Sequence, residues 1–265
     1  DSDSDNGSSR QKHLAKQENP PASPTEAIDL LTHYNPTSVA SEAFKTVRTS
    51  LLLSFPETPP HTILITSSRP GEGKTFVACN LAISLAQLDK RVVLIDGDMR
   101  NPRVHRVWGI RNDTGLSRFL TSDVKAGEVI RPSKVKGLSL ITSGSKTPRP
   151  AELLSSHRLT QLLEQLKAEF DHVIVDSPPL MPVTDAVILA AKSNCVVMVV
   201  HGGVTPRDVV QMAKQKLVKS DATMAGVVLN YIDLTDPYYY YSYYSRYYAY
   251  RYGEQPKALP PKFIQ

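Results

Sequence analysis

Cysteine is scarce in this 265-residue sequence, which holds only Cys79 and Cys195, each within an apolar segment. Two thiols without the spacing of metal ligands argue against a disulfide-stapled fold and against a cysteine-ligated metal site. We therefore expect both thiols to be buried in a protein of a reducing compartment. A chain of this length can bury a hydrophobic core without such covalent support.

Long hydrophobic runs are missing as well. The most apolar stretch, residues 183–200, is interrupted by Asp185, Lys192 and Asn194, whereas a membrane span needs about 18 uninterrupted apolar residues. The sequence opens Asp-Ser-Asp-Ser-Asp, with neither an initiator Met nor a signal peptide, so we expect a piece of a longer protein, with room for a membrane anchor upstream. The net charge of +5 comes without a run of Lys and Arg, which argues against nucleic acid as a partner.

Composition divides the chain into three regions. Residues 1–23 are polar and poor in large apolar side chains, which predicts a flexible linker, and residues 24–232 have the composition of a globular domain. Residues 233–265 form a low-complexity segment that predicts a flexible tail. Ten of the twelve tyrosines lie there: Tyr238, Tyr239, Tyr240, Tyr241, Tyr243, Tyr244, Tyr247, Tyr248, Tyr250 and Tyr252. By composition alone, such a run also fits a sticky or adhesive segment.

Apolar patterning predicts the fold of the central region. Short β-branched runs, most of them continuous rather than alternating, predict strands over residues 62–66, 91–95, 138–142, 172–175, 195–200 and 226–229. Helical patterns fall at residues 38–54, 74–88, 153–170, 184–191 and 206–218. Strands that alternate with helices predict an α/β fold with a mostly parallel, doubly wound sheet and helices on both faces. Ligands bind at the edge of such a sheet where the strands end.

A phosphate-binding loop follows the first predicted strand and leads into a helix. Its residues are Pro70, Gly71, Glu72, Gly73, Lys74, Thr75 and Phe76. The two glycines let main-chain N–H groups close on phosphate oxygens, the helix adds its positive end, and the lysine reaches the β- and γ-phosphates. The threonine is expected to ligate Mg²⁺. Ser68 stands where the full motif has glycine, and Pro70 stiffens the loop.

Carboxylates follow two further strands. Asp96 and Asp98 leave the second strand with one residue between them, and Asp176 closes the hydrophobic strand Val-Ile-Val-Asp. A pair of acids with the same side-chain direction suits a metal shell and a proton acceptor for an incoming hydroxyl. The third acid is typical of a residue that organises Mg²⁺. Together with the loop, these residues predict a site for ATP and Mg²⁺.

These motifs resemble those of the bacterial tyrosine kinases of capsule and exopolysaccharide synthesis. The resemblance covers roughly residues 38–252. It rests on the phosphate loop with no lysine directly before Pro70, on Asp96-x-Asp98-x-Arg100, on Asp176-Ser177-Pro178-Pro179 and on the tyrosine cluster. It extends to Glu42-x-x-Lys45-x-x-Arg48, similar to the family's Glu-x-x-Arg-x-x-Arg subunit contact, and to the Pro148–Leu154 stretch, where Arg149 replaces the expected Asn.

The resemblance implies a P-loop fold related to partitioning and cell-division ATPases. It implies a homo-oligomeric ring at the cytoplasmic face of the bacterial inner membrane, in which each subunit phosphorylates a neighbour's tyrosine tail. The implied partners are a membrane part of the same polypeptide or a separate membrane activator, a tyrosine phosphatase and polysaccharide-biosynthesis proteins. Glu42, Lys45 and Arg48 would mediate the ring, although such charges also fit a merely solvated helix face.

The residues themselves agree with phosphoryl transfer to a phenol. A tyrosine hydroxyl, with a pKa of about 10, is a poor nucleophile until its proton is accepted. We assign Asp96 as this base and Asp98 and Asp176 to the Mg²⁺ shell, and the exchange of roles between Asp96 and Asp98 stays open. Lys74 is expected to neutralise phosphate charge.

Two other classes share the fold. A partitioning or positioning ATPase would carry a lysine where Arg69 stands and has no need of clustered tyrosines. No C-terminal amphipathic helix for a membrane is predicted, since Pro256, Pro260 and Pro261 break the last stretch. An iron–sulfur carrier ATPase would need a shared cysteine pair, which the two cysteines do not form.

Overall fold

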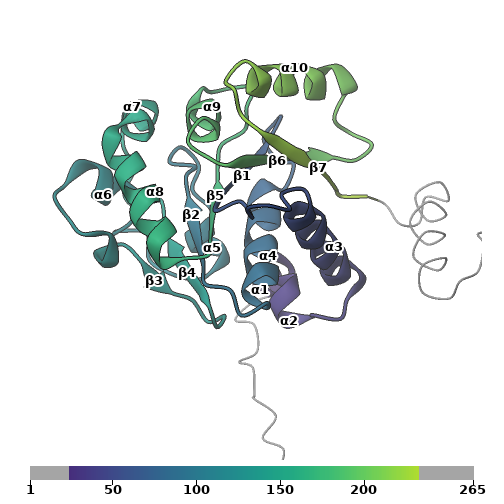
Figure 1. Ribbon diagram of the computed structural model, residues 1–265, viewed down its shortest axis with the longest axis horizontal. Helices are drawn as coiled ribbons and strands as arrows, with labels where there is room; N and C mark the ends of the chain where they lie inside the picture. The colour runs from purple at the N-terminus through teal and green to yellow at the C-terminus, as the bar shows by residue number, and fades with distance from the viewer. Residues whose placement is uncertain (1–23, 233–265) are drawn as a thin grey trace, which may run out of the picture.

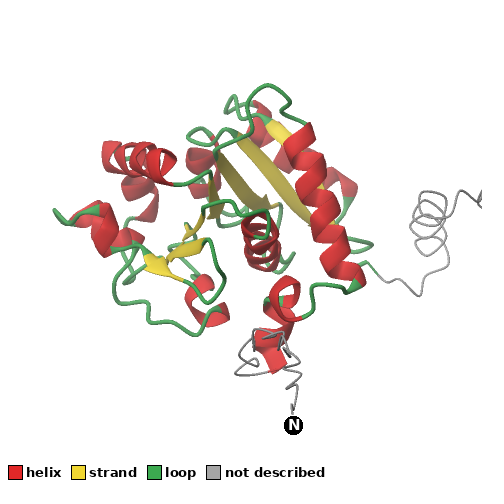
Figure 2. Ribbon diagram, turned by 60° about the horizontal axis from the view of Figure 1, so that its bottom comes forward, coloured by secondary structure: helices red, strands yellow, loops and turns green. Residues whose placement is uncertain are grey.

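A computed structural model describes residues 24–232, which form one sheet between two layers of helices (Figures 1 and 2). The linker predicted over residues 1–23 and the tail predicted over residues 233–265, with its ten tyrosines, lie outside the described residues.

The sheet has seven strands in the order β3-β4-β2-β5-β1-β6-β7. They are β1 (Thr62–Ser67), β2 (Val92–Asp96), β3 (Arg131–Pro132), β4 (Leu138–Ile141), β5 (His172–Asp176), β6 (Cys195–His201) and β7 (Met224–Asn230). All neighbours pair in parallel except β3, which is antiparallel to β4. The parallel doubly wound sheet is therefore confirmed. Its order sets β2, β5 and β1 side by side, so the three strands that carry the predicted site residues end at one edge.

One face of the sheet is covered by the first part of the chain. The helices there are α1 (Pro24–Asp29), α2 (Leu31–Tyr34), α3 (Val39–Leu53), α4 (Lys74–Ala86) and α5 (Val104–Val107). Helix α4 packs between the sheet and α3 and buries residues on all its sides, which explains its unbroken apolar sequence. Asn80, a buried polar residue of α4, accepts a hydrogen bond from the Thr32 N–H and donates to the Asp29 carbonyl. This amide therefore ties α1 and α2 to the central helix.

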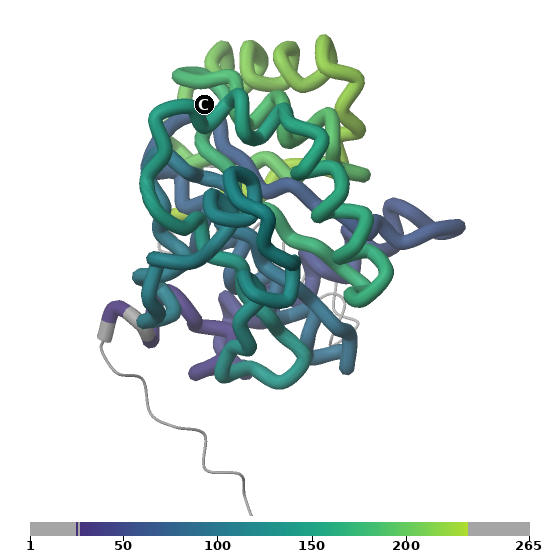
Figure 3. Tube along the Cα trace, turned by 90° about the vertical axis from the view of Figure 1, so that its left-hand side faces the viewer, coloured from purple at the N-terminus to yellow at the C-terminus, as the bar shows by residue number. Residues whose placement is uncertain are grey.

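The opposite face carries the second half of the chain. Its helices are α6 (Leu116–Thr121), the 3₁₀ turn η1 (Ala126–Glu128), α7 (Pro150–Ser155), α8 (His157–Glu169), α9 (Asp185–Ala190) and α10 (Arg207–Val218). Alternate residues of each central strand point to the two cores: Ile63 and Ile65 to the first, Leu64 to the second. In side view, α10 lies at one end of the molecule and residues 24–35 at the other (Figure 3).

Several predicted elements differ in detail. The helix expected over residues 153–170 is two helices, because Ser156 takes an extended conformation (φ −61°, ψ 155°) between them. The shortest elements, such as β3 and α5, had no periodic signal, since two to four residues cannot show one. Val39, an apolar residue in the helical pattern over residues 38–54, is 45% exposed because it lies at the first turn of α3. No helix within residues 24–232 has the length and apolar character that crossing a bilayer requires.

Candidate active site

The phosphate-binding loop joins β1 to α4 as the sequence predicts. Gly71 (φ +83°) and Gly73 (φ +87°) take left-handed conformations that side chains disfavour, and α4 begins at Lys74. Ser68, which replaces the motif's glycine, has no positive φ and is fully buried. Its hydroxyl donates to the Glu72 carboxylate at 2.8 Å, so this position serves as a brace for the loop.

The buried side chain of Glu72 fixes the loop through several hydrogen bonds. It is 2% exposed and accepts hydrogen bonds from the Arg69 N–H at 2.7 Å and from the Thr205 hydroxyl, in addition to Ser68. The Glu72 carbonyl accepts from the Asn230 side chain at 3.1 Å. Thr205 lies after β6 and Asn230 is the last residue of β7, so the ends of two further strands fix the loop that follows β1. The sequence carried no signal for this clamp, because its partners lie 133 and 158 residues away.

The last strand approaches the loop closely at Gly73. A Cβ at this position would collide with the side-chain amide of Asn230 and lie 3.4 Å from the ring of Tyr231. Tyr231 itself has φ +56°, and the centroid of its ring lies 4.5 Å from that of His201, with the two rings tilted by 39°. Glycine is thus needed at position 73 both for its conformation and for the space it leaves.

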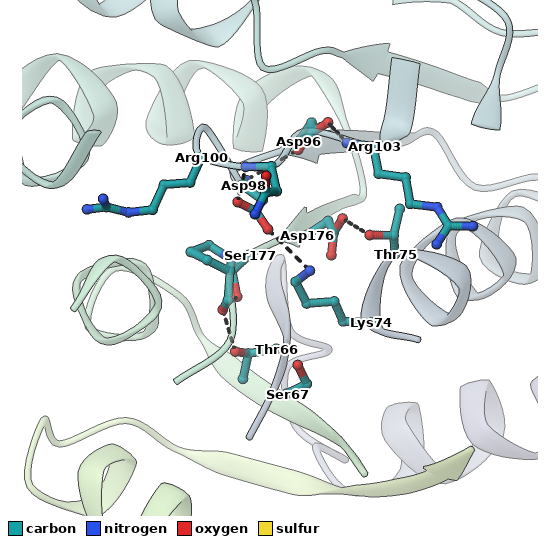
Figure 4. A network of polar contacts seen from close by, with 12 residues as sticks. Thr66, Ser67, Lys74, Thr75, Asp96, Asp98, Arg100, Arg103, Asp176 and Ser177 are labelled. Atoms are coloured by element: carbon teal, nitrogen blue, oxygen red, sulfur yellow. Dashed lines mark hydrogen bonds and ion pairs between the residues drawn. The ribbon is translucent and has the colours of Figure 1, made fainter. Parts of the chain in front are cut away.

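The predicted carboxylates meet the loop at the sheet edge (Figure 4). Asp96 and Asp176 are paired neighbours on β2 and β5. The Lys74 ammonium lies 3.2 Å from the Asp98 carboxylate, and the Thr75 hydroxyl donates to Asp176 at 2.6 Å. All three acids are at most 3% exposed, so the structure concentrates negative charge beside the lysine.

Burial perturbs two of these acids. It raises the pKa of Asp176 to about 6, although the charge of Lys74 and the hydrogen bond from Thr75 oppose the rise. Burial, reinforced by the charge of Asp176, raises the pKa of Asp96 well above its usual range, and the N–H groups of Val104 and Arg103 oppose it. Buried carboxylates that lie close together and have raised pKa values are typical of functional sites.

The chemistry of these donors fits Mg²⁺. Asp176 Oδ1 is buried and has no hydrogen-bond partner among the described residues, while its other oxygen is engaged by Thr75. Because the Thr75 hydroxyl donates its hydrogen bond to Asp176, the lone pairs of its oxygen are available to a metal. Within residues 24–232, no group of three or more His, Cys, Asp or Glu residues is arranged to hold a metal alone. In nucleotide sites Mg²⁺ is bound by one or two carboxylates and keeps waters and phosphate oxygens among its other ligands.

Comparison with known proteins assigns this chain to a family. Residues 60–220 match the family model described as AAA domain. The chain is 36% identical over 195 residues to the tyrosine-protein kinase YwqD of Bacillus subtilis, covering 74% of this chain and 82% of that protein. This chain belongs to the bacterial tyrosine-protein kinases. Both the resemblance stated from the sequence and the assignment to an enzyme class are confirmed.

Solved structures give the same answer for the kinase. The kinase domain of the Escherichia coli tyrosine kinase ETK superposes with a TM-score of 0.74 at 33% identity, covering 83% of this chain and 84% of that one. The cell-division ATPase MinD of Pyrococcus furiosus superposes with a TM-score of 0.58 at 22% identity, covering 66% and 74%. The MinD likeness shows the fold alone, and it confirms the predicted relation to cell-division ATPases at that level.

An ion pair between a part-exposed arginine and a buried aspartate secures the loop after β2 in the kinase. The Arg100 guanidinium makes two hydrogen bonds to Asp185, at 2.8 and 2.9 Å, and Asp185 is fully buried at the start of α9. The loop after β5 is held in turn by Thr66, whose hydroxyl donates to the Pro178 carbonyl at 3.0 Å. The loops that follow β2 and β5 are thus both fixed by residues of other elements.

The three charges predicted to mediate the ring lie apart from this site, on α3. Lys45 pairs with Glu42 at 2.8 Å within the helix. Arg48, half-buried like the other two, points its guanidinium to α4, where it donates at 2.7 Å to the carbonyl of Ser84. Arg48 is therefore more than a solvated charge, because its long side chain reaches the neighbouring helix.

Phe76, predicted with the loop, turns its ring to the core, where it packs edge-on to Phe44 at 5.6 Å. The other loop residues and the three aspartates are brought together at one edge.

Proposed function

We propose that this chain is a Mg²⁺- and ATP-dependent tyrosine autokinase that phosphorylates the C-terminal tyrosines of neighbouring subunits. Residues 24–232 would be the kinase domain, residues 1–23 a linker and residues 233–265 the substrate tail. The observation that carries the proposal is the meeting of Lys74 and Thr75 with three buried aspartates at adjacent strand ends, in a chain that also carries ten clustered tyrosines.

The loop would bind the nucleotide through its main chain. The N–H groups of residues 71–76 would face the phosphates, and Lys74 would exchange its ion pair with Asp98 for one with the β- and γ-phosphate oxygens. Thr75, Asp98 and Asp176 would hold Mg²⁺, directly or through water. When bound, this ion supplies neutralisation of phosphate charge. The exchange at Lys74 frees Asp98 at the moment when the nucleotide arrives, which couples binding to assembly of the site.

Asp96 would accept the phenol proton as the tyrosine oxygen bonds to the γ-phosphorus and ADP leaves. Its Oδ2 is held by the N–H groups of Arg103 and Val104, at 3.1 and 3.0 Å. Its Oδ1 makes only a long contact of 3.3 Å with the Asp98 N–H. One oxygen is therefore oriented while the other keeps lone pairs for a proton, and the raised pKa of Asp96 makes it a stronger base.

The cellular role is regulation of exopolysaccharide or capsule polymerisation and export at the cytoplasmic face of the inner membrane. The proposed partners are other copies of this chain in a ring, a membrane part of the same polypeptide or a membrane activator, a tyrosine phosphatase and polysaccharide-biosynthesis proteins. The family membership supports this role. The pair of Glu42 and Lys45 supports the ring, because both ions are part-exposed on α3 and can exchange partners with a neighbour.

Phosphosite mapping tests the activity. The purified 265-residue chain is incubated with Mg²⁺ and ATP and its modified residues are identified by mass spectrometry, with Lys167→Met as the control for removal of a surface lysine paired at 2.7 Å. We expect phosphate on the tail tyrosines of wild type and control, and none in Lys74→Met. Absence of phosphotyrosine in wild type, or normal labelling in folded Lys74→Met, would contradict the proposal.

A second pair of variants separates the two candidate bases. Asp96→Asn should lower transfer to tyrosine far more than affinity for Mg-ADP, because a base acts only on the reacting hydroxyl. Asp98→Asn should also raise the Mg²⁺ concentration needed for half-maximal binding. The reverse pattern would assign the base to Asp98.

A further inference from the structure

Arg103 contacts the candidate site with its main chain and a distant helix with its side chain. Its N–H donates to Asp96 at 3.1 Å, and the next N–H, of Val104, donates to the same oxygen at 3.0 Å. Its guanidinium donates to both carboxylate oxygens of Asp29, at 3.1 and 3.3 Å. In Figure 4 the guanidinium points away from the three carboxylates. The residue therefore connects the buried Asp96 with α1.

Asp29 is built into its position more firmly than an ordinary surface acid. It ends α1, its side chain is 11% exposed, and its carbonyl accepts a hydrogen bond from the buried Asn80 at 2.9 Å. Asn80 belongs to α4, the helix that begins with the phosphate-binding lysine. The main chain of Asp29 is thus tied to the same helix that carries Lys74 and Thr75.

The remaining support for Asp96 is weak. Beyond the N–H groups of Arg103 and Val104, its carboxylate receives only the 3.3 Å contact from Asp98. Arg103 is not itself inside α5 but precedes its first turn, with φ −129° and ψ −26°, so no helical hydrogen bond from its own N–H restrains it. The ion pair with Asp29 anchors this residue from outside the loop, and the charge of Arg103 also opposes the rise in the pKa of Asp176.

We infer that Asp29 is a positioning residue for phosphoryl transfer: through Arg103, it holds the two N–H groups that orient Asp96. The expected effect on the phosphorylation rate rests on the proposed function. The expected effect on the two N–H groups that contact Asp96 rests on the geometry alone. It assigns α1, at the far end of the domain from α10, a role in the reaction. Movement of α1 relative to α4 would loosen the orientation of Asp96 without touching the nucleotide loop.

The test compares four forms of the full 265-residue chain: wild type, Asp29→Asn, Arg103→Gln and the double variant. Arg111→Gln is the matched control, because it removes an exposed arginine that pairs with Asp113 at 3.0 Å. Three quantities are measured: amide hydrogen exchange of peptides spanning residues 97–107, the single-turnover rate of tyrosine phosphorylation, and the Kd for Mg-ADP.

We expect faster exchange at residues 103 and 104 in both single variants and not in the control. The phosphorylation rate should fall about three- to tenfold, the range for a residue that acts through another, with Kd within about twofold of wild type. The double variant should match the single ones, because both changes break the same contact. Arg103→Lys, which keeps the cation, should recover part of the rate.

Unchanged exchange and rates in Asp29→Asn and Arg103→Gln would overturn the inference, and so would equal losses in rate and in Mg-ADP affinity. Arg103→Gln decides the matter alone if Asp29→Asn does not fold. If wild type transfers no phosphate to tyrosine, the proposed function fails. The exchange measurement still decides whether Asp29 positions the amides on Asp96.

Discussion

Replacing Glu72 with glutamine tests whether its buried carboxylate braces the phosphate-binding loop. The carboxylate accepts from the Ser68 hydroxyl at 2.8 Å, from the Arg69 N–H at 2.7 Å and from the Thr205 hydroxyl. Glutamine keeps one of the two oxygens and replaces the other with an NH₂ group, which cannot accept hydrogen bonds from the donors at that position. Hydrogen bonds to a charged group contribute about 1.5–3 kcal/mol each, so losing one or two lowers the free energy of unfolding by about 3 kcal/mol.

Urea unfolding and titration with Mg-ADP measure the two consequences. Besides the loss of stability, we expect about tenfold weaker binding of Mg-ADP, since the loop must be ordered again when the nucleotide arrives. Glu164→Gln is the control, because this 63%-exposed side chain pairs with Lys167 at 2.7 Å in solvent, and its unfolding midpoint should stay at the wild-type value.

A finer series isolates one contact of the brace. Thr205→Val removes the hydroxyl at nearly constant volume, whereas Thr205→Ser keeps it. The valine variant should share the direction of the Glu72→Gln effect and the serine variant should not. Equal stability and equal Mg-ADP affinity in Glu72→Gln and Glu164→Gln would refute the reasoning.

Three further predictions concern the loop, the ring and the tail. Gly73→Ala should abolish Mg-ADP binding in titrations, because the new Cβ would collide with Asn230 and a φ of +87° is strained for alanine. The control variant Gly127→Ala should bind Mg-ADP normally, because there is open space around Gly127. Lys45→Ala should give monomers in light scattering, with an unchanged unfolding midpoint. Arg48→Ala should also lower the unfolding midpoint, because it loses the hydrogen bond to Ser84. Oligomers of wild-type size in Lys45→Ala would contradict a ring formed through Glu42 and Lys45. Phosphorylation of the tail should shift the protein from oligomer to monomer, and a phosphatase should reverse the shift. Each phosphotyrosine adds about −1.5 to −2 charges, which are repelled by the three buried aspartates of the site. An oligomer size that does not change on phosphorylation would contradict this prediction.

The sheet and its ligand edge were predictable because their signals are local. Strands that are buried on both faces have unbroken apolar sequences. Asp96 and Asp176 stand out because each is an acid directly after such a sequence. The glycines of the loop follow from the backbone conformation that phosphate binding requires. Strand order then brings these separate signals together at one place.

The supports of the site were not predictable, because they join residues far apart in sequence. Glu72 meets Thr205 across 133 residues, and Asp29 meets Arg103 across 74. Arg48 looked like a surface charge because periodicity cannot show that a long side chain bends onto α4. Ser156 divides a helix whose apolar pattern continues through it. In each case packing between elements, which one sequence does not display, decides the outcome.

The measurement that tests the central proposal most directly is phosphate transfer between two marked chains. Lys74→Met protein with its tail intact is mixed with Mg²⁺, ATP and an active chain whose ten tail tyrosines are replaced by phenylalanine. The tail peptides of the inactive chain are then examined by mass spectrometry. Transfer in trans predicts phosphotyrosine between residues 238 and 252 of the Lys74→Met chain. An unlabelled tail, beside normal self-labelling of wild type under the same conditions, would contradict it.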